Sequence, residues 1–413
     1  MIQMSQEKPN EAVPAKVRLG NIAAQAYQDA WDAKKRGEKV GWCASNFPQE
    51  IHECLGVKVV YPENQAAAIA AKGGGTRMCE HAESMGYSSD ICAYARISLA
   101  FADVKQSPEL DMPQPDFVLC CNNICNCMIK WYENLAHDLN IPLIMLDIPF
   151  RPEPGYDMES AHAEYVKSQF DHAIRQLAEV TGKTFSQERF DEVCRISQRT
   201  AKAWLKASEY CKYEPSPLNG FDLFNHMAVA VCARGKLEAA EAFEQLVDEY
   251  AAAVKNGTST YKGEQKFRIL FEGIACWPHL RATFTPLKEH GINVVATVYA
   301  DAFGVLYRNS AEMIRAYASV PNCLSVEDAA EMRIKVGRQN KIDGAIIHTN
   351  RSCKLWSGIM PEVERRIRTE LNIPTVTFDG DQADPRVFSE AQYNTRVEAL
   401  AEIMAANKQG AAS

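Results

Sequence analysis

Short apolar strands alternate with amphipathic helices in two blocks of this sequence, and a long stretch without strand signals separates the blocks. Strict alternation of strand and helix favours parallel sheets, because each helix returns the chain to the edge where the next strand begins. The sequence therefore predicts two α/β domains joined by a helical segment. The expected strands are 39–42, 57–61, 116–120 and 142–147 in the first block, and 267–271, 293–298, 344–348 and 375–378 in the second.

The expected boundaries divide the chain into four parts, and both sheets are expected to be Rossmann- or flavodoxin-like. The 413 residues exceed what one hydrophobic core usually supports, which agrees with two domains. Between the domains, apolar residues recur at helical spacing and no strand pattern is found. The parts are an N-terminal helical arm (1–38), the first α/β domain (39–157), the helical bridge (158–262) and the second α/β domain (263–413).

Charge and hydropathy argue against several classes of protein. The net charge is -8 and no Lys/Arg cluster offers a phosphate-binding surface, so nucleic acid is not an expected partner. No apolar run approaches the ~18 residues of a membrane span, and residues 1–16 are too polar for a signal peptide. We therefore expect a soluble, cytoplasmic protein. Walker A, dinucleotide-binding and nucleophile-elbow motifs are also missing, so the chain is not expected to hydrolyse ATP itself.

Cysteine is frequent for such a chain, with 14 residues, and three of them have a setting suited to metal binding. Cys125 lies in a cysteine-rich segment where a predicted strand gives way to a helix. Cys92 and Cys353 each follow a short polar run typical of a helix start. A thiol in the first turn of a helix lies at the positive end of the helix dipole, which favours the thiolate. Together the three thiolates are candidates to hold a [4Fe–4S] cluster and leave one iron without a protein ligand.

Cysteine spacing alone leaves a second interpretation open. The chain has no C-x2-C-x2-C run and no paired C-x2-C, and free cysteine is among the most buried residue types. The thiols around the strand end can therefore simply pack in the core. For Cys120, Cys121 and Cys127 individually, core packing is the preferred interpretation.

Two further polar residues follow strands of the first domain. Ser45 follows the strand 39–42 and Glu63 follows the strand 57–61, so both are expected near the sheet edge that also carries Cys125. There a hydroxyl and a carboxylate would position a substrate or an oxygen ligand of the open iron. The alternative is that Ser45 begins a turn and Glu63 caps a helix. His348, at the end of another strand, is more readily explained as a buried, hydrogen-bonded histidine than as a base.

Taken together, eight ordered segments resemble the α subunit of 2-hydroxyacyl-CoA dehydratases, the 2-hydroxyglutaryl-CoA dehydratase family. The resemblance extends over about residues 17–407. The segments are GWCASNFPQE (41–50), YPENQ (61–65), CAYAR (92–96), CCNNIC (120–125), IKWYEN (129–134), GFDLF (220–224), NRSCKL (350–355) and DGDQADPR (379–386).

This resemblance implies a site, partners and a reaction. Cys92, Cys125 and Cys353 would bind a [4Fe–4S] cluster with one iron lacking a protein ligand, and Ser45 and Glu63 would be the active-site hydroxyl and carboxylate. The partners would be a β subunit, an ATP-dependent iron–sulfur activator that supplies one electron, and an acyl-CoA substrate. The reaction would be reversible loss of water from an (R)-2-hydroxyacyl-CoA to give an (E)-2-enoyl-CoA.

A radical route has a chemical reason. The hydroxyl is α to the thioester carbonyl and the departing proton is on the unactivated β carbon, so ordinary acid–base elimination has the wrong polarity. By resemblance, one electron converts the carbonyl to a ketyl radical anion, hydroxide leaves, and the β proton becomes acidic. The electron is then returned for the next turnover. The resemblance does not identify the base that takes this proton.

Two alternatives and one substrate expectation accompany the resemblance. A subunit of a benzoyl-CoA-reductase-type enzyme would share the architecture but consume electrons stoichiometrically. A non-catalytic iron–sulfur carrier protein would share the cysteines. The segments GWCASNFPQE, FNHMAVAVCARG and NRSCKLWSG are closer to members that act on aryl-lactoyl or branched thioesters. We therefore expect (R)-phenyllactoyl-CoA as substrate, ahead of (R)-2-hydroxyisocaproyl-CoA and (R)-lactoyl-CoA.

Overall fold

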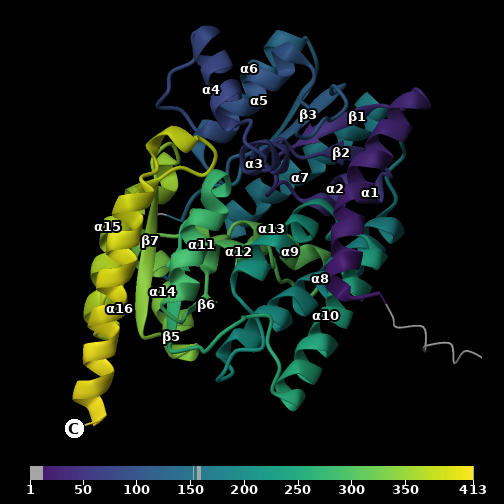
Figure 1. Cartoon of the computed structure of the whole chain (residues 1–413). Helices are drawn as coiled ribbons and strands as arrows, with labels where there is room; N and C mark the ends of the chain where they lie inside the picture. The colour runs from purple at the N-terminus through teal and green to yellow at the C-terminus, as the bar shows by residue number, and fades with distance from the viewer. Residues whose placement is uncertain (1–12, 152, 156–159, 413) are drawn as a thin grey trace, which may run out of the picture.

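The computed structural model describes residues 13–151, 153–155 and 160–412. It contains two four-stranded sheets in which every strand is parallel to its neighbours, as the sequence predicts (Figure 1). The first twelve residues of the predicted arm lie outside the described residues, as does the predicted boundary between 157 and 158. The other boundaries stay a prediction.

The first sheet has the strand order β2-β1-β3-β4 and is covered by helices. All residues of β1 and β3 are buried, as expected for central strands of a parallel sheet with both faces covered. The strands are β1 (Val40–Cys43), β2 (Lys58–Val60), β3 (Phe117–Cys121) and β4 (Leu143–Leu146), and the helices that follow them are α2 (Gln49–Cys54), α3 (Pro62–Ala71), α4 (Gly75–Ser84), α5 (Ala93–Val104) and α6 (Asn126–Leu139).

The second sheet repeats this order as β6-β5-β7-β8. Its strands are β5 (Phe267–Glu272), β6 (Ile292–Ala296), β7 (Gly344–Asn350) and β8 (Thr375–Gly380). Its helices are α11 (Leu280–Glu289), α12 (Val298–Asp301), α13 (Ser310–Tyr317), α14 (Val326–Gln339), α15 (Lys354–Leu371) and α16 (Glu390–Ala412). Short 3₁₀ turns are η1 (Tyr210–Lys212), η2 (Trp277–His279), η3 (Pro321–Cys323) and η4 (Pro385–Val387). The two sheets thus confirm the predicted fold class.

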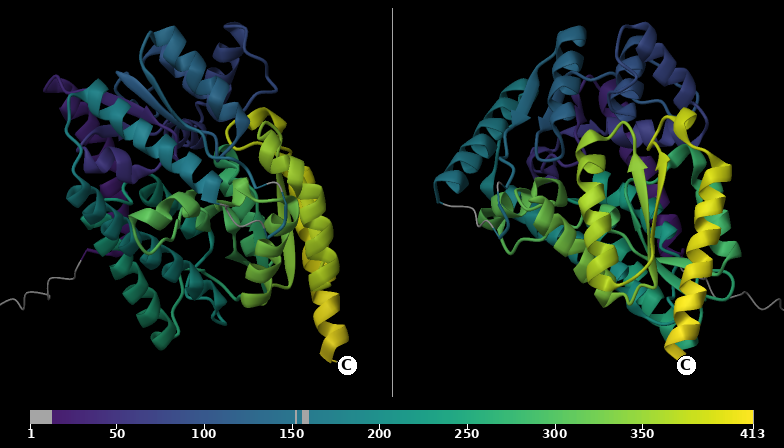
Figure 2. Two further views of the ribbon diagram at one scale, coloured as in Figure 1. Left: turned by 180° about the vertical axis from the view of Figure 1, so that it is seen from behind. Right: turned by 90° about the vertical axis from the view of Figure 1, so that its left-hand side faces the viewer.

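Helices alone connect the two sheets in the described part of the chain. They are α7 (Ser160–Thr181), α8 (Gln187–Glu209), α9 (Phe221–Cys232) and α10 (Leu237–Asn256), and the N-terminal helix α1 (Ala15–Lys35) packs against α9 and α10. Figure 2 shows these helices beside both sheets rather than as a thin linker. Buried Arg234, which follows α9, lies 3.8 Å from the carboxylate of buried Glu50 in α2, so the helical segment is fixed to the first sheet's helices.

The helical pattern expected over 65–86 is interrupted by three glycines (73–75), as the sequence predicts: α3 ends before Gly73, which adopts a positive φ of 90°, and α4 begins at Gly75. One local prediction differs from the structure. The strand expected over 293–298 ends at Ala296, and the chain turns at Thr297 into α12. This early turn brings Tyr299, in α12, to the end of the sheet.

The carboxyl ends of both sheets face each other across the molecule (Figures 1 and 2). In each sheet the chain order reverses beside the first strand, at β1/β3 and at β5/β7. Ligands of open α/β sheets bind outside the carboxyl ends of the strands at such reversal points. Among the described residues, no helix is both long and apolar enough to cross a membrane.

Candidate functional site

One cavity of about 90 Å³ lies at the reversal points of both sheets. It is lined by residues that follow the carboxyl ends of β1, β3, β5 and β7. Ser45 follows β1, Cys125 follows β3, Ile274 follows β5 and Cys353 follows β7. Glu63 also lines the cavity, as does Cys92. The fold therefore brings all five predicted site residues, which lie far apart in the sequence, to one place between the sheets.

Ser45 and Glu63 form a directly hydrogen-bonded pair. The backbone N–H and the hydroxyl of Ser45 both donate to Glu63 Oε1 at 2.9 Å, and the hydroxyl of Tyr132 donates to Glu63 Oε2 at 3.2 Å. Burial raises the pKa of Glu63 above its ordinary value, although these hydrogen bonds oppose the effect. A carboxyl in this position keeps its proton to higher pH than an exposed carboxyl does, which suits it to proton exchange.

Cys92, Cys125 and Cys353 are the N-cap residues of α5, α6 and α15. Each thiol lies near the backbone N–H of the residue three positions on, which lowers its pKa. Burial has the larger effect and raises the pKa of all three thiols, with a further contribution from the neighbouring cysteines. The helix ends therefore do not by themselves make thiolates here. A bound cation is needed to favour that form.

Cys127 packs against the edge of the core, as the preferred interpretation has it, but it also lies at this site. It is only half-buried and lines the cavity together with Cys92, Cys125 and Cys353. The same four cysteines line a cleft of about 420 Å³ on their other side. Cys120 and Cys121, by contrast, are fully buried in β3, as the sequence predicts. The signal for Cys127 was its place two residues after Cys125, in the first turn of α6.

The three cap cysteines offer thiols, which are the ligands that iron–sulfur clusters take. In the part of the chain that the structure describes, no group of three His, Cys, Asp or Glu side chains converges as one ion requires. A cube-shaped cluster is bound at its corners, so its thiolates need not converge on one point. The buried indole N–H groups of Trp131 and Trp356 line the cavity and have no described acceptor. A ligand rich in acceptors, such as sulfide or oxygen, would satisfy them.

The loop after β8 is hydrogen-bonded to residues at and beside the cap cysteines. Gln382 Nε2 donates to Cys92 Sγ at 3.4 Å and to Ser352 Oγ at 2.8 Å. Asp381 accepts from the backbone N–H of Ser352 at 2.8 Å, which fixes the residue before Cys353. The polar loop that follows β8 thus contacts two of the three cap segments. In the sequence, this loop was marked only by the resemblance of the segment 379–386 to the dehydratase family.

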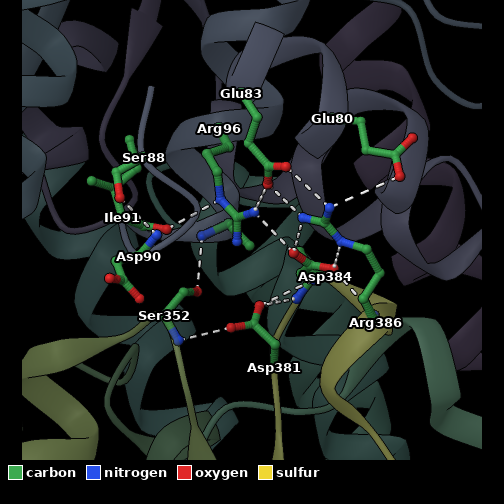
Figure 3. Close-up of polar contacts among 12 residues, drawn as sticks. Glu80, Glu83, Ser88, Asp90, Ile91, Arg96, Ser352, Asp381, Asp384 and Arg386 are labelled. Carbon is green, nitrogen blue, oxygen red and sulfur yellow. Dashed lines mark hydrogen bonds and ion pairs between the residues drawn. The ribbon is translucent and has the colours of Figure 1, made fainter. Parts of the chain in front are cut away.

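The same loop is fixed to the first domain by charges (Figure 3). Buried Arg96, in α5, contacts Asp384 at 2.9 Å and Glu83 at 2.7 Å. Arg386 contacts the same two carboxylates at 2.6 and 2.5 Å. Burial alone would raise the pKa of Asp384, but hydrogen bonds from Arg386 and Arg96 outweigh burial and hold this pKa below its ordinary value. The loop therefore has a fixed position between the domains.

His348 lies outside the cavity lining. Its ring is fully buried and stacks on Phe378 at 4.5 Å, and its Nδ1 is 2.6 Å from the carbonyl oxygen of Ile274. Burial lowers the pKa of His348 to about 4, so the ring is neutral near neutral pH. This agrees with the preferred interpretation as a packed histidine.

Comparison with known proteins gives one consistent result. Residues 44–404 match the family model described as 2-hydroxyglutaryl-CoA dehydratase, D-component. The chain is 59% identical to the (R)-phenyllactyl-CoA dehydratase alpha subunit of Clostridium sporogenes, over 96% of this chain and 97% of that one. It is 45% identical to the (R)-2-hydroxyglutaryl-CoA dehydratase subunit alpha of Acidaminococcus fermentans, over 97% and 98% of the two chains. It is 44% identical to the (R)-2-hydroxyisocaproyl-CoA dehydratase alpha subunit of Clostridioides difficile, over the same shares.

Proposed function

The chain belongs to the 2-hydroxyglutaryl-CoA dehydratase D-component family, and on this premise we propose that it is the α subunit of an (R)-2-hydroxyacyl-CoA dehydratase. It removes water reversibly from an (R)-2-hydroxyacyl-CoA to give the (E)-2-enoyl-CoA, through a ketyl radical of the substrate. One observation carries the proposal. The hydroxyl and carboxyl of Ser45 and Glu63 and the three N-cap cysteines line a single cavity between the sheets.

Cys92, Cys125 and Cys353 are the residues that would hold a [4Fe–4S] cluster in this cavity. When bound, such a cluster supplies a Lewis-acidic iron without a protein ligand and a route for one electron. The cysteines come from three separate helix starts, and Ser45 and Glu63 line the same cavity. Trp131 lines both the cavity and the outer cleft, as the three cysteines do.

Ser45 and Glu63 are the proposed catalytic pair. Ser45 donates its hydroxyl proton to Glu63, so the lone pairs of its oxygen are left to accept from a substrate hydroxyl. Glu63 is buried, and its raised pKa allows the carboxyl to exchange a proton at Oε1 or Oε2 during turnover. Tyr132 holds the carboxyl in place from the other side. The three groups orient the 2-hydroxyacyl end of the thioester.

The proposed acyl group is aromatic. Identity to the phenyllactyl-CoA dehydratase subunit is 59%, against 45% and 44% for the relatives named for 2-hydroxyglutaryl- and 2-hydroxyisocaproyl-CoA. The cavity wall includes Trp131, Phe303 and Trp356, whose rings suit edge-to-face contact with a phenyl group. We therefore place (R)-phenyllactoyl-CoA first, ahead of (R)-2-hydroxyisocaproyl-CoA and (R)-lactoyl-CoA.

The proposed partners are a β subunit, as the alpha-subunit names of the relatives suggest, and an ATP-dependent iron–sulfur activator. The test is anaerobic turnover of (R)-phenyllactoyl-CoA by the α–β complex with activator, ATP and a low-potential reductant. We expect cinnamoyl-CoA in large excess over ATP consumed, because the electron is recycled. ATP consumed in step with every product would instead indicate a reductase, and no product with any of the three thioesters would contradict the proposal.

A further inference from the structure

A chain of hydrogen bonds leads from the second domain into the cavity and has no role in the function described so far. The indole N–H of Trp277, in η2, donates to the hydroxyl of Tyr94 at 2.5 Å. Tyr94 follows Cys92 by two residues, and its hydroxyl interacts with that of Tyr299 in α12. Tyr94 and Tyr299 both line the cavity.

The chemistry of these groups favours one direction for the chain. An indole N–H can only donate, so the Tyr94 oxygen accepts from Trp277, and the proton of Tyr94 remains available for donation to Tyr299. The Tyr299 oxygen then accepts, and its proton has no acceptor among the described residues. A phenol that receives a hydrogen bond in this way is a stronger donor, because hydrogen bonds in a chain polarise one another.

The ring of Tyr299 is held between aromatic neighbours. Phe303 and Trp356 contact it edge-to-face, at centroid distances of 6.0 and 5.9 Å. Tyr299 lines the same cavity as Cys353, Cys92 and Glu63. The free donor therefore shares this cavity with the proposed cluster ligands and the Ser45–Glu63 pair.

We propose that Tyr299 is a further catalytic residue, whose hydroxyl donates a hydrogen bond to the 2-hydroxyl oxygen of the bound thioester. This inference rests on the proposed function. After one electron from the iron–sulfur activator has reduced the thioester carbonyl, the C2–O bond breaks. Its electron pair stays on the departing oxygen, which leaves as hydroxide, and the proton later lost from C3 completes the water. The enoyl thioester then gives back the one extra electron. A fixed donor at that oxygen stabilises the charge that develops on it.

The test is binding without turnover, using the α–β complex with its clusters but without activator. Affinities are measured for (R)-phenyllactoyl-CoA and for 3-phenylpropionyl-CoA, which lacks the 2-hydroxyl. For Tyr299→Phe, which keeps the ring, we expect affinity for the hydroxy thioester to fall about 3- to 10-fold and affinity for the deoxy thioester to be unchanged. Tyr94→Phe removes the hydrogen bond behind Tyr299 and should give a smaller loss in the same direction.

The matched control is Tyr393→Phe, because Tyr393 is a buried phenol whose hydroxyl bonds to Thr283 of the second domain, away from the cavity. It should change neither affinity. Equal losses for both thioesters, or no loss for either in Tyr299→Phe, would overturn this inference while the proposed function stands. Failure of the unmodified complex to bind either thioester would overturn the proposed function and this inference with it.

Discussion

The backbone N–H of Ala93 donates a hydrogen bond to the side chain of Ser352 at 2.9 Å, across 259 positions of sequence. Ala93 is the first residue of α5, directly after Cys92, and Ser352 directly precedes Cys353. Ser352, the neighbour of Cys353, therefore caps α5, the helix that begins after Cys92. The bond is buried, so it sets the distance between the two cap segments in the absence of solvent competition.

Replacing Ser352 should loosen the site. Ser352→Ala leaves the buried N–H of Ala93 without its acceptor and removes one of the two acceptors of the Gln382 amide. Such a loss costs about 1–3 kcal/mol in free energy of unfolding. We also expect chelators to remove iron faster from the variant. The control is Ser84→Ala, because the hydroxyl of Ser84 is exposed. Denaturant unfolding measures the loss of stability, and the rate of iron removal by a chelator measures the loosening of the site. Equal stabilities and equal rates for the two variants would contradict the proposal that Ser352 supports the site.

Glu63→Gln should separate catalysis from cluster binding. The amide cannot exchange a proton and cannot accept at both ends, so we expect turnover to fall by about 10²-fold or more while iron content is retained. Glu133→Gln, at an exposed position of α6, is the control. Turnover within a few-fold of the original enzyme would remove Glu63 from the mechanism.

Stability should also depend on pH through Glu63. Its native pKa lies above that of the unfolded chain, so the native state favours the protonated carboxyl. The stability that protonation contributes is fully present below the unfolded pKa and is lost as pH rises through the native pKa. The free energy of unfolding of the original protein, relative to Glu63→Gln, should therefore decline from acid towards neutral pH. A difference independent of pH would contradict the shifted pKa.

The ion pairs of Arg96 and Arg386 with Glu83 and Asp384 should be essential for the position of the loop after β8. Arg96→Met leaves Asp384 buried with one partner fewer, and breaking a buried pair costs about 3–5 kcal/mol. Asp384 has a lowered pKa, so its contribution to stability is present above the unfolded pKa and is lost as pH falls through the native pKa. Arg77→Met, whose ion pair with Glu109 is at the surface, should cost less than about 1 kcal/mol. Thermal unfolding of both variants measures the difference.

Substrate choice should respond to the aromatic wall. Phe303→Leu removes a ring from the cavity, and we expect the ratio of kcat/KM for (R)-phenyllactoyl-CoA over (R)-2-hydroxyisocaproyl-CoA to fall about 10-fold. Phe388→Leu, whose ring stacks on His279 outside the cavity lining, should leave that ratio unchanged. Parallel changes for both substrates would show that Phe303 contributes packing alone.

Sequence reasoning found the strands and the cap cysteines because their signals are local. Apolar runs with turn residues mark strands such as β3, and a polar run before Cys92 or Cys353 marks a helix start. The turn at Thr297 was missed, because an apolar run continues through it to Val298. Without that turn, nothing placed Tyr299 at the end of the sheet.

The supporting contacts could not be predicted, because they join residues far apart in the chain. Tyr94 meets Trp277 across 183 positions, and Gln382 meets Cys92 across 290. No local pattern marks such a pair, and a tyrosine next to a cluster ligand looks the same in sequence as one in the core. The family resemblance marked the segments that contain Tyr94 and Gln382 as important, but it did not say which residues they contact.

The most direct measurement is iron and acid-labile sulfide per α chain after strictly anaerobic purification. We expect about four of each. Both should fall when Cys92, Cys125 or Cys353 is changed to serine, and both should persist in Cys127→Ser, whose thiol lines the same cavity. A chain without iron, or iron content indifferent to the three cap cysteines, would contradict the central claim that these thiols hold a [4Fe–4S] cluster.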